Sequence, residues 1–231
     1  MTGGSGVGTL ISAPNHPDLA DYRTRILNSL DDSTLKYANS IIDEALRKVL
    51  NEYTRAFPNI KSNTVTISTT GRLQSLISCA NLMNIIQLVH PYISNISDPF
   101  CSEREDFALT WLDGSPMAFF TGDDIPQISE VIYVKYAAKQ LIKDLDSSEI
   151  TTIRDDHEDL LIIGAAGLSA MMRASGLTEK WGTIPNQQSN LMLWGQTQYR
   201  RFQEFLIEIR SELPVDIFPN SSWKLDQWDG K

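Results

Sequence analysis

The chain has 231 residues, 42% of them hydrophobic, and a formal net charge of −9 from 20 basic and 29 acidic side chains. That length and content suffice for a sizeable core, in one large domain or two small ones. The acidic balance argues against a protein that wraps nucleic acid through phosphate contacts. Two cysteines, Cys79 and Cys101, and the lack of a signal-peptide pattern lead us to expect a cytoplasmic protein with free thiols.

The first third of the sequence predicts a flexible arm followed by helices. Residues 1–17 are rich in glycine and proline and poor in apolar anchors. A flexible arm is favoured there over a nucleotide-binding loop, because no strand precedes the glycines and no Lys-Ser or Lys-Thr follows them. A weak helical pattern covers 19–30. Apolar residues at helical spacing then predict an amphipathic helix over 35–57, which Pro58 ends.

The middle of the chain changes to the period of β-strands. Residues 64–69, 107–112 and 131–136 alternate in polarity, and 85–90 is a further candidate, preceded by an ambiguous segment at 75–83. Asp113-Gly114 precedes the apolar run 117–120 and predicts the turn of a β-hairpin. We therefore expect a small antiparallel sheet.

Helical signals return over 137–145, continue to Ala174, and end in an amphipathic helix over 191–213. The predicted fold is mainly α, a helical bundle with a small antiparallel β insertion in the middle of the chain and extended arms at both ends. In residue ranges, the arms are 1–17 and 214–231, the bundle is built from 18–62 and 137–213, and the β-rich insertion is 63–136.

One helix stands out because it is apolar on nearly every side. No charged side chain occurs from 160 to 172, and Gly164, Gly167, Ala166 and Ala170 offer small surfaces on at least two faces. Such a helix must be buried all round, with neighbouring helices at close approach. The apolar stretch is shorter than the roughly 20 residues that cross a bilayer, so we expect no membrane span.

The residues that could carry chemistry are few. Asp155-Asp156-His157-Glu158-Asp159 could hold a metal, but its place before the apolar helix favours helix capping. The acidic segment 143–159 is expected to be a solvated connection, or the wall of a channel if copies form a ring. The histidines, which are His16, His90 and His157, lack the spacing of a zinc motif.

Nucleophilic catalysis also lacks support in the sequence. Cys79 lies among apolar residues and is expected to be a small buried hydrophobe. A Cys–His pair would need Cys79 or Cys101 to meet His90 or His157 in space, which the sequence does not show. No Gly-x-Ser-x-Gly elbow or Walker loop occurs. We therefore expect no enzyme, no cofactor and no metal.

The C-terminal segment 214–231 combines helix-breaking residues with large apolar ones. Folding back onto its own domain and docking on a partner are both open, because buried tryptophans often anchor interfaces. For the docking interpretation, the candidate partner-binding residues are Phe218, Trp223, Leu225 and Trp228.

Between 132 and 176 several short features follow one another in a recognisable order. A strand ending in Val134-Lys135-Tyr136 precedes Leu145-Asp146, Thr151-Thr152-Ile153, Glu158-Asp159-Leu160 and Gly164-Ala165-Ala166-Gly167, and a long helix with Tyr199-Arg200-Arg201-Phe202 comes later. This order resembles the head-to-tail connector proteins of tailed bacteriophages, also called adaptor or head-completion proteins. The hairpin with Asp113-Gly114 suits the β insertion of that family, and the resemblance extends over about 63–213.

The resemblance implies a non-enzymatic virion protein in the neck between head and tail, made in the host cytoplasm. It implies a homo-oligomeric ring, usually dodecameric, that binds the portal protein on one face and a tail or tail-completion protein on the other. DNA would pass through without specific binding, and the C-terminal segment would dock on the portal. Two rival hypotheses remain: a small helical enzyme with its site in the β insertion, and a monomeric cytoplasmic adaptor or chaperone.

Overall fold

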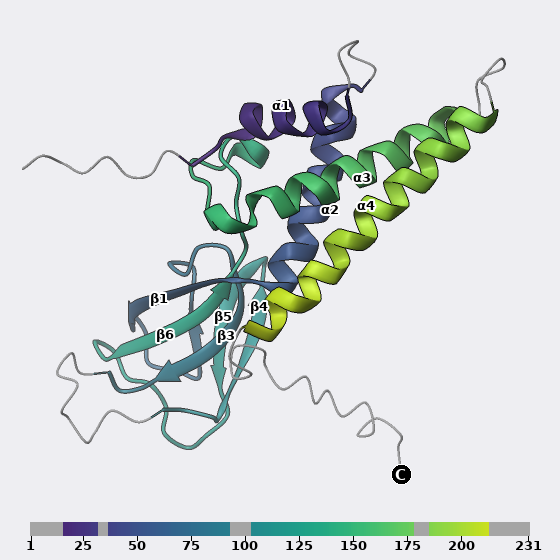
Figure 1. Cartoon of the computed structure of the whole chain (residues 1–231). Helices are drawn as coiled ribbons and strands as arrows, with labels where there is room; N and C mark the ends of the chain where they lie inside the picture. The colour runs from purple at the N-terminus through teal and green to yellow at the C-terminus, as the bar shows by residue number, and fades with distance from the viewer. Residues whose placement is uncertain (1–15, 32–36, 93–102, 178–184, 213–231) are drawn as a thin grey trace, which may run out of the picture. The chain divides into compact units, whose positions relative to one another are not determined.

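The computed structural model describes residues 16–31, 37–92, 103–177 and 185–212, with only the backbone for 185–187 and 212. The chain divides into two compact units. Unit 1 comprises Met1–Leu46 and Leu141–Tyr199, and unit 2 comprises Arg47–Gln140 and Arg200–Lys231. Figure 1 shows the elements in chain order, from α1 in purple to α4 in yellow-green. The helices α2 (Asn39–Ala56) and α4 (Pro185–Glu212) each belong to both units.

Unit 1 is helical, and its first helix is tied to the rest by polar contacts. Helix α1 (Leu19–Ser29) begins with a capping box between Asp18 and Asp21. Arg23 of α1 makes a two-pronged ion pair with Asp43 of α2, with N–O distances of 2.8 and 2.7 Å. These contacts tie α1 to α2, and Tyr22 and Ile26 of α1 are fully buried.

Helix α3 (Glu158–Leu177) is buried on most of its surface, which confirms the prediction from its composition. It meets α4 at two glycines. A Cβ added at Gly167 would lie 2.8 Å from the carbonyl oxygen of Gly195, and one added at Gly195 would lie 2.7 Å from that of Gly167.

Helix α3 is longer than the apolar stretch 160–172, whose short length led us to expect no membrane span. By length and composition alone, 155–177 is apolar enough to cross a membrane, a test that buried core helices also pass, and 56% of its apolar window is buried inside the protein.

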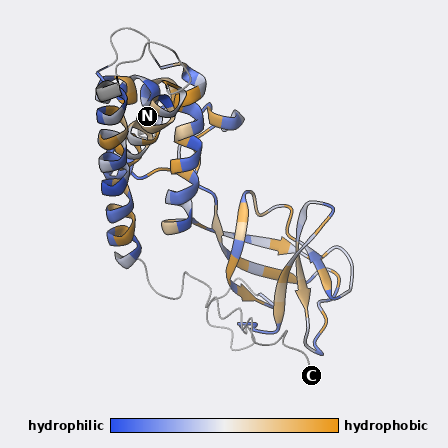
Figure 2. Ribbon diagram, turned by 90° about the vertical axis from the view of Figure 1, so that its right-hand side faces the viewer, coloured by the Kyte–Doolittle hydropathy of each residue, from blue (hydrophilic) through white to orange (hydrophobic). Residues whose placement is uncertain are grey.

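Unit 2 contains two three-stranded antiparallel sheets, where the sequence predicted one. The first has the order β1-β6-β3 and consists of β1 (Asn59–Thr66), β6 (Val131–Ala138) and β3 (Leu82–Val89). The second has the order β2-β5-β4 and consists of β2 (Leu73–Ser75), β5 (Ser115–Phe120) and β4 (Phe107–Leu112). Apolar side chains of both sheets form one core that includes Leu88, Phe120 and Ile132. The strands are largely orange in Figure 2, as such a core requires.

The hairpin between β4 and β5 is confirmed, with Asp113-Gly114 as its turn. Both turn residues have positive φ, 49° at Asp113 and 76° at Gly114. That backbone matches the twist of the flanking strands and favours Asp-Gly. The helices predicted over 19–30 and 35–57 are also present, the second as α2.

Two predicted segments were wrong. Residues 137–145 do not form a helix, because β6 continues through Ala138, which pairs with Asn59 on one side and Leu82 on the other. Only a short 3₁₀ turn at Leu145–Ser147 follows. The strand expected at 64–69 begins earlier, at Asn59, directly after the helix that Pro58 ends. In place of a mainly α protein, the described residues form a mixed α and β structure with four α-helices.

We expect Gly167→Ala and Gly195→Ala each to destabilise the protein by about 1–3 kcal/mol, because a methyl group there must push two helix backbones apart. The control is Gly176→Ala in the same helix α3, where nothing lies within 4 Å of an added Cβ. This control should be neutral or stabilising by up to about 1 kcal/mol, since alanine favours helix over glycine. Urea unfolding followed by circular dichroism measures all three, and equal effects would contradict the close crossing.

Candidate interaction surface

Buried polar groups of unit 2 serve its core. The His90 side chain is 1% exposed, and its Nε2 lies 2.9 Å from Oε2 of Glu130. Its ring also meets the ring of Phe120 edge-on, with 5.8 Å between centroids. The same Glu130 oxygen accepts a hydrogen bond from the backbone of Gln127. These contacts hold the end of β3 to the start of β6.

Cys79 is a buried side chain, as predicted, with 2% exposure in the core of the two sheets. Burial raises the pKa of its thiol, and this effect exceeds that of the hydrogen bonds with Asn63 and Ser78, which lower the pKa. A raised pKa leaves less of the reactive thiolate at neutral pH. None of these contacts brings Cys79 to His90, and Cys101 lies outside the described residues.

The acidic residues before α3 lie at its N-terminal turn, as the capping interpretation requires, and they form ion pairs. Arg25 of α1 donates from Nη1 to Glu158 and from Nη2 to Asp159, both over 2.7 Å. Arg154 forms a second pair with Asp156, and its side chain makes no capping hydrogen bond to the short 3₁₀ turn that follows it. The acidic residues therefore complement the helix dipole and also join α1 to α3.

Three possible metal ligands lie close together at this junction. Ligand atoms of His16, Asp155 and Glu158 lie within 4.8 Å of one another, and His16 Nδ1 is 3.1 Å from Asp155. The approach of His16 was not predicted, because it is far from Asp155 and Glu158 along the chain. Arg25 already neutralises Glu158, and Asp155 is 74% exposed. A cation here would have to compete with the guanidinium, so the arrangement fits an ion-pair junction better than a metal centre.

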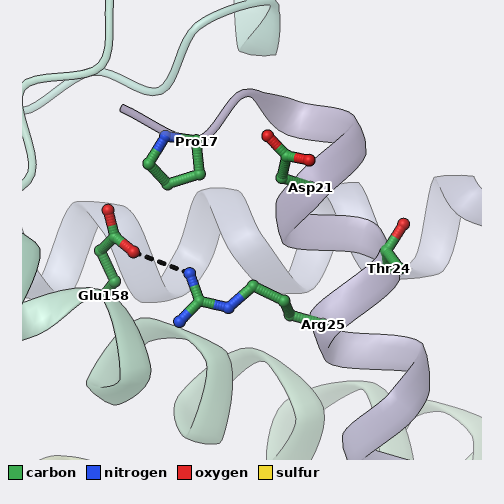
Figure 3. Close-up of a pocket in the computed structure, with 5 residues that line it drawn as sticks. All are labelled: Pro17, Asp21, Thr24, Arg25 and Glu158. Carbon is green, nitrogen blue, oxygen red and sulfur yellow. Dashed lines mark hydrogen bonds and ion pairs between the residues drawn. The ribbon is translucent and has the colours of Figure 1, made fainter. Parts of the chain in front are cut away.

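A depression of about 330 Å³ lies beside this junction. Figure 3 shows it between the start of α1 and the start of α3, with Arg25 reaching toward Glu158. Its lining residues are Pro17, Asp21, Thr24, Arg25 and Glu158. Arg25 and Glu158 both line the depression and form an ion pair with each other, so their charges are largely neutralised within the protein.

An arginine network holds the start of the β4–β5 hairpin. Arg104, whose side chain is 9% exposed, makes two 2.7 Å hydrogen bonds to Asp106 and also binds Asp124. Its guanidinium lies over the ring of Phe120 at 5.7 Å. The hydrogen bonds from Arg104 lower the pKa of Asp106. The network anchors the base of a hairpin whose tip has fewer contacts.

The outer face of the sheet β2-β5-β4 carries apolar side chains and no charge. In its register Leu73 pairs with Phe119, which pairs with Ala108, and the next outward row is Ser75, Met117 and Thr110. Leu73 is 37% exposed and Phe119 is 40% exposed. At the hairpin tip Leu112, which lies on the same face, is 52% exposed, and Trp111, which alternates onto the opposite face, is 55% exposed. An apolar patch that spans three strands is a candidate interaction surface.

The sequence predicted a different docking element. Its proposed anchors lie outside the described residues, as do residues 1–15 of the predicted arm 1–17. The patch on the sheet was missed because alternation shows that a strand has two faces, but not which face another part of the chain covers. The missed residues of this face are Leu73, Leu112 and Phe119, and the proposed anchors were Phe218, Trp223, Leu225 and Trp228.

Comparison with known proteins gives little similarity. No protein-family model matches the sequence, and no curated protein does. Among solved structures, a chain described as "Neck of empty GTA particle computed with C6 symmetry" aligns over 76% of this chain and 87% of its own length. The identity is 13% and the TM-score 0.31. At those values the similarity does not establish a common fold.

We expect Arg104→Gln to lower stability and to flatten its dependence on acid pH. Since the pKa of folded Asp106 is below its unfolded value near 4, this pair stabilises the fold above about pH 4. That contribution is lost as the pH falls through the folded pKa. Urea unfolding at several pH values between 7 and 3 measures the slope. The control is the exposed Arg55→Gln, and an unchanged slope in Arg104→Gln would contradict the assignment.

A double-mutant cycle tests the junction of α1 and α3. Arg25→Gln is expected to cost on the order of 1 kcal/mol, because Arg25 is partly exposed while Glu158 is 12% exposed. Adding Glu158→Gln to Arg25→Gln should cost less than Glu158→Gln does in the natural chain. Additive losses would show that the ion pair does not couple the two helices.

Proposed function

We propose that this chain is a non-enzymatic structural protein of a phage-like virion, which joins the DNA-filled head to the tail. The observation that carries the proposal is the apolar outer face of the sheet β2-β5-β4, with its exposed hairpin tip. Exposed aromatic and aliphatic side chains on a rigid sheet fit a protein that works by permanent contact with other proteins. The order of features over 132–176 supports the same role.

In the proposed assembly, identical copies form a ring in the neck, with the portal protein on one side and a tail or tail-completion protein on the other. The formal charge of −9 per copy supports the passage of DNA, because phosphates are repelled by acidic walls. The burial and raised pKa of Cys79, together with the core contacts of His90, support a role without catalysis. A monomeric adaptor would use the same apolar face, and the ring is preferred for the order of features over 132–176.

We propose further that the segment 214–231 docks on the portal, through Phe218, Trp223, Leu225 and Trp228. A chain that ends at Leu213 should keep the circular dichroism spectrum and unfolding midpoint of the full chain but fail to bind portal-bearing heads in a pull-down. The matched control is the full chain with Lys224→Ala, which keeps all four apolar anchors. Normal binding by the shortened chain would refute docking through this segment.

A further inference from the structure

The strand β4 is an edge without the usual protection. Among the described residues it pairs only with β5, and its six residues, Phe-Ala-Leu-Thr-Trp-Leu, include no charge and no proline. Its register with β5 is continuous from Phe107 to Leu112, so no bulge bends it away. Natural edge strands are normally protected by such devices against pairing with another chain. Their absence suggests that the edge has a partner in the assembled protein.

The opposite edge of the same sheet is β2. The carbonyl of Arg72 accepts a hydrogen bond from Phe120, and the N–H of Leu76 donates to Pro116, over 2.8 and 2.9 Å. Because peptide groups alternate in direction along a strand, those of Leu73 and Ser75 point away from β5. Both edges of the sheet can therefore accept a further strand.

The charges at the two ends of β4 favour parallel pairing of β4 with β2 of a second copy over antiparallel pairing of β4 with β4. Glu105, which is exposed, precedes β4, and Asp113 follows it. Antiparallel pairing of β4 with β4 of a second copy would bring these like charges together, which is destabilising. Parallel pairing of β4 with β2 of a second copy avoids this.

Parallel pairing also places opposite charges side by side. Phe107 pairs with Phe120, and the N–H of Thr121 donates to the carbonyl of Asp106, so the ladder reaches Asp106 and Glu105 comes just before it, near Gly122. Arg72, which precedes β2, donates from Nη1 to the carbonyl of Gly122 over 2.7 Å. Its guanidinium therefore lies at the level that Glu105 of a neighbouring copy would occupy.

We propose that β4 of one copy pairs with β2 of the next, parallel and in register, so that the sheets of successive copies join. This rests on the proposed function, because it supplies the contact that closes the ring. An interface between two different edges is heterologous and generates a ring when the rotation closes. Strands β2 and β4 run in the same direction, since both are antiparallel to β5, so rotation about an axis along the strands keeps them parallel.

The same pairing extends the apolar outer face. Leu73 would lie beside Ala108 of the next copy, and Ser75 beside Thr110. Ile77, which is 72% exposed, lies in the turn directly after β2, at the end of the edge that the next copy would cover. The side chains that a single copy leaves in water would thus be partly covered by the neighbour. Between two chains of net charge −9, a neutral edge of this kind is where close approach costs least.

Two variants, each with one introduced cysteine, test the pairing. Adjacent strands lie about 4.8 Å apart, within the range that a disulfide spans. The full chain with Cys101→Ser is prepared with Ser75→Cys or with Thr110→Cys, while Cys79 stays buried. A disulfide-linked dimer should form under mild oxidation only when the two variants are mixed, and the chain with both substitutions should give a ladder of linked copies. Linkage of Thr110→Cys with itself, or none in the mixture, would overturn the proposal.

Sedimentation of the full chain tests the proposed interface by a method that needs no introduced cysteine. Leu112→Asp should weaken self-association by about tenfold or more, because it places a charge in a covered apolar edge. The matched control is Ile128→Asp, at an isoleucine that is 61% exposed and lies outside the six strands. A natural chain that stays monomeric at its highest soluble concentration, or equal association by both variants, would overturn the proposal. An extended segment of another protein would then be the better occupant of β4.

The two proposals fail in different ways. Cross-linking in the mixture with no incorporation into portal-bearing heads would refute the virion role and leave the pairing of copies intact. Incorporation into heads without cross-linking would refute the pairing alone.

Discussion

The crossing of α3 and α4 at Gly167 and Gly195 is the constraint on which the helical unit depends. Each glycine places its carbonyl where the Cβ of the other would be, at 2.7 to 2.8 Å, so the two backbones are in direct contact. With helices this close, the remaining faces of α3 must be small or aliphatic, and Ala165, Ala166 and Ala170 are fully buried. The two acidic side chains of α3, Glu158 and Asp159, lie in its first turn, and its basic residue, Arg173, follows the apolar stretch. Arg25 of α1 forms ion pairs with both acidic side chains and so joins α1 to α3.

The sequence predicted those helices and strands whose own residues show a clear hydrophobic pattern or turn motif. The helices α2 and α4 show helical spacing over ten residues or more, α3 contains a long apolar stretch, and the β4–β5 hairpin has its turn residues in place. The three-residue strand β2 is too short to show alternation. The end of β6 was assigned to a helix because Ala137 and Ala138 favour helices locally, whereas strands on both sides hold them in the sheet.

The functional residues were harder to predict because their roles depend on contacts between distant parts of the chain. Arg25 meets Glu158 across 133 positions of sequence, and Gly195 matters only because Gly167 lies opposite. The sequence placed the interaction surface in the tryptophan-containing tail, since large apolar residues in a segment with helix breakers are conspicuous. Phe119 lay in the predicted hairpin and Leu73 in no predicted strand, and only the pairing of three strands shows that they share a face that the described residues leave partly exposed.

The fold of the single copy also determines which charges its sheet edge presents. A Cβ at Gly122 would lie 1.7 Å from a carboxylate oxygen of Asp106, so this aspartate occupies the space that a larger residue would need. Arg104 holds it there with two hydrogen bonds, and its charge is balanced within the copy. Successive residues of an extended chain point in opposite directions, so Glu105 is directed away from this network. The buried arginine that stabilises the hairpin thus leaves one acidic group at the start of β4, in position to meet Arg72 of a neighbour.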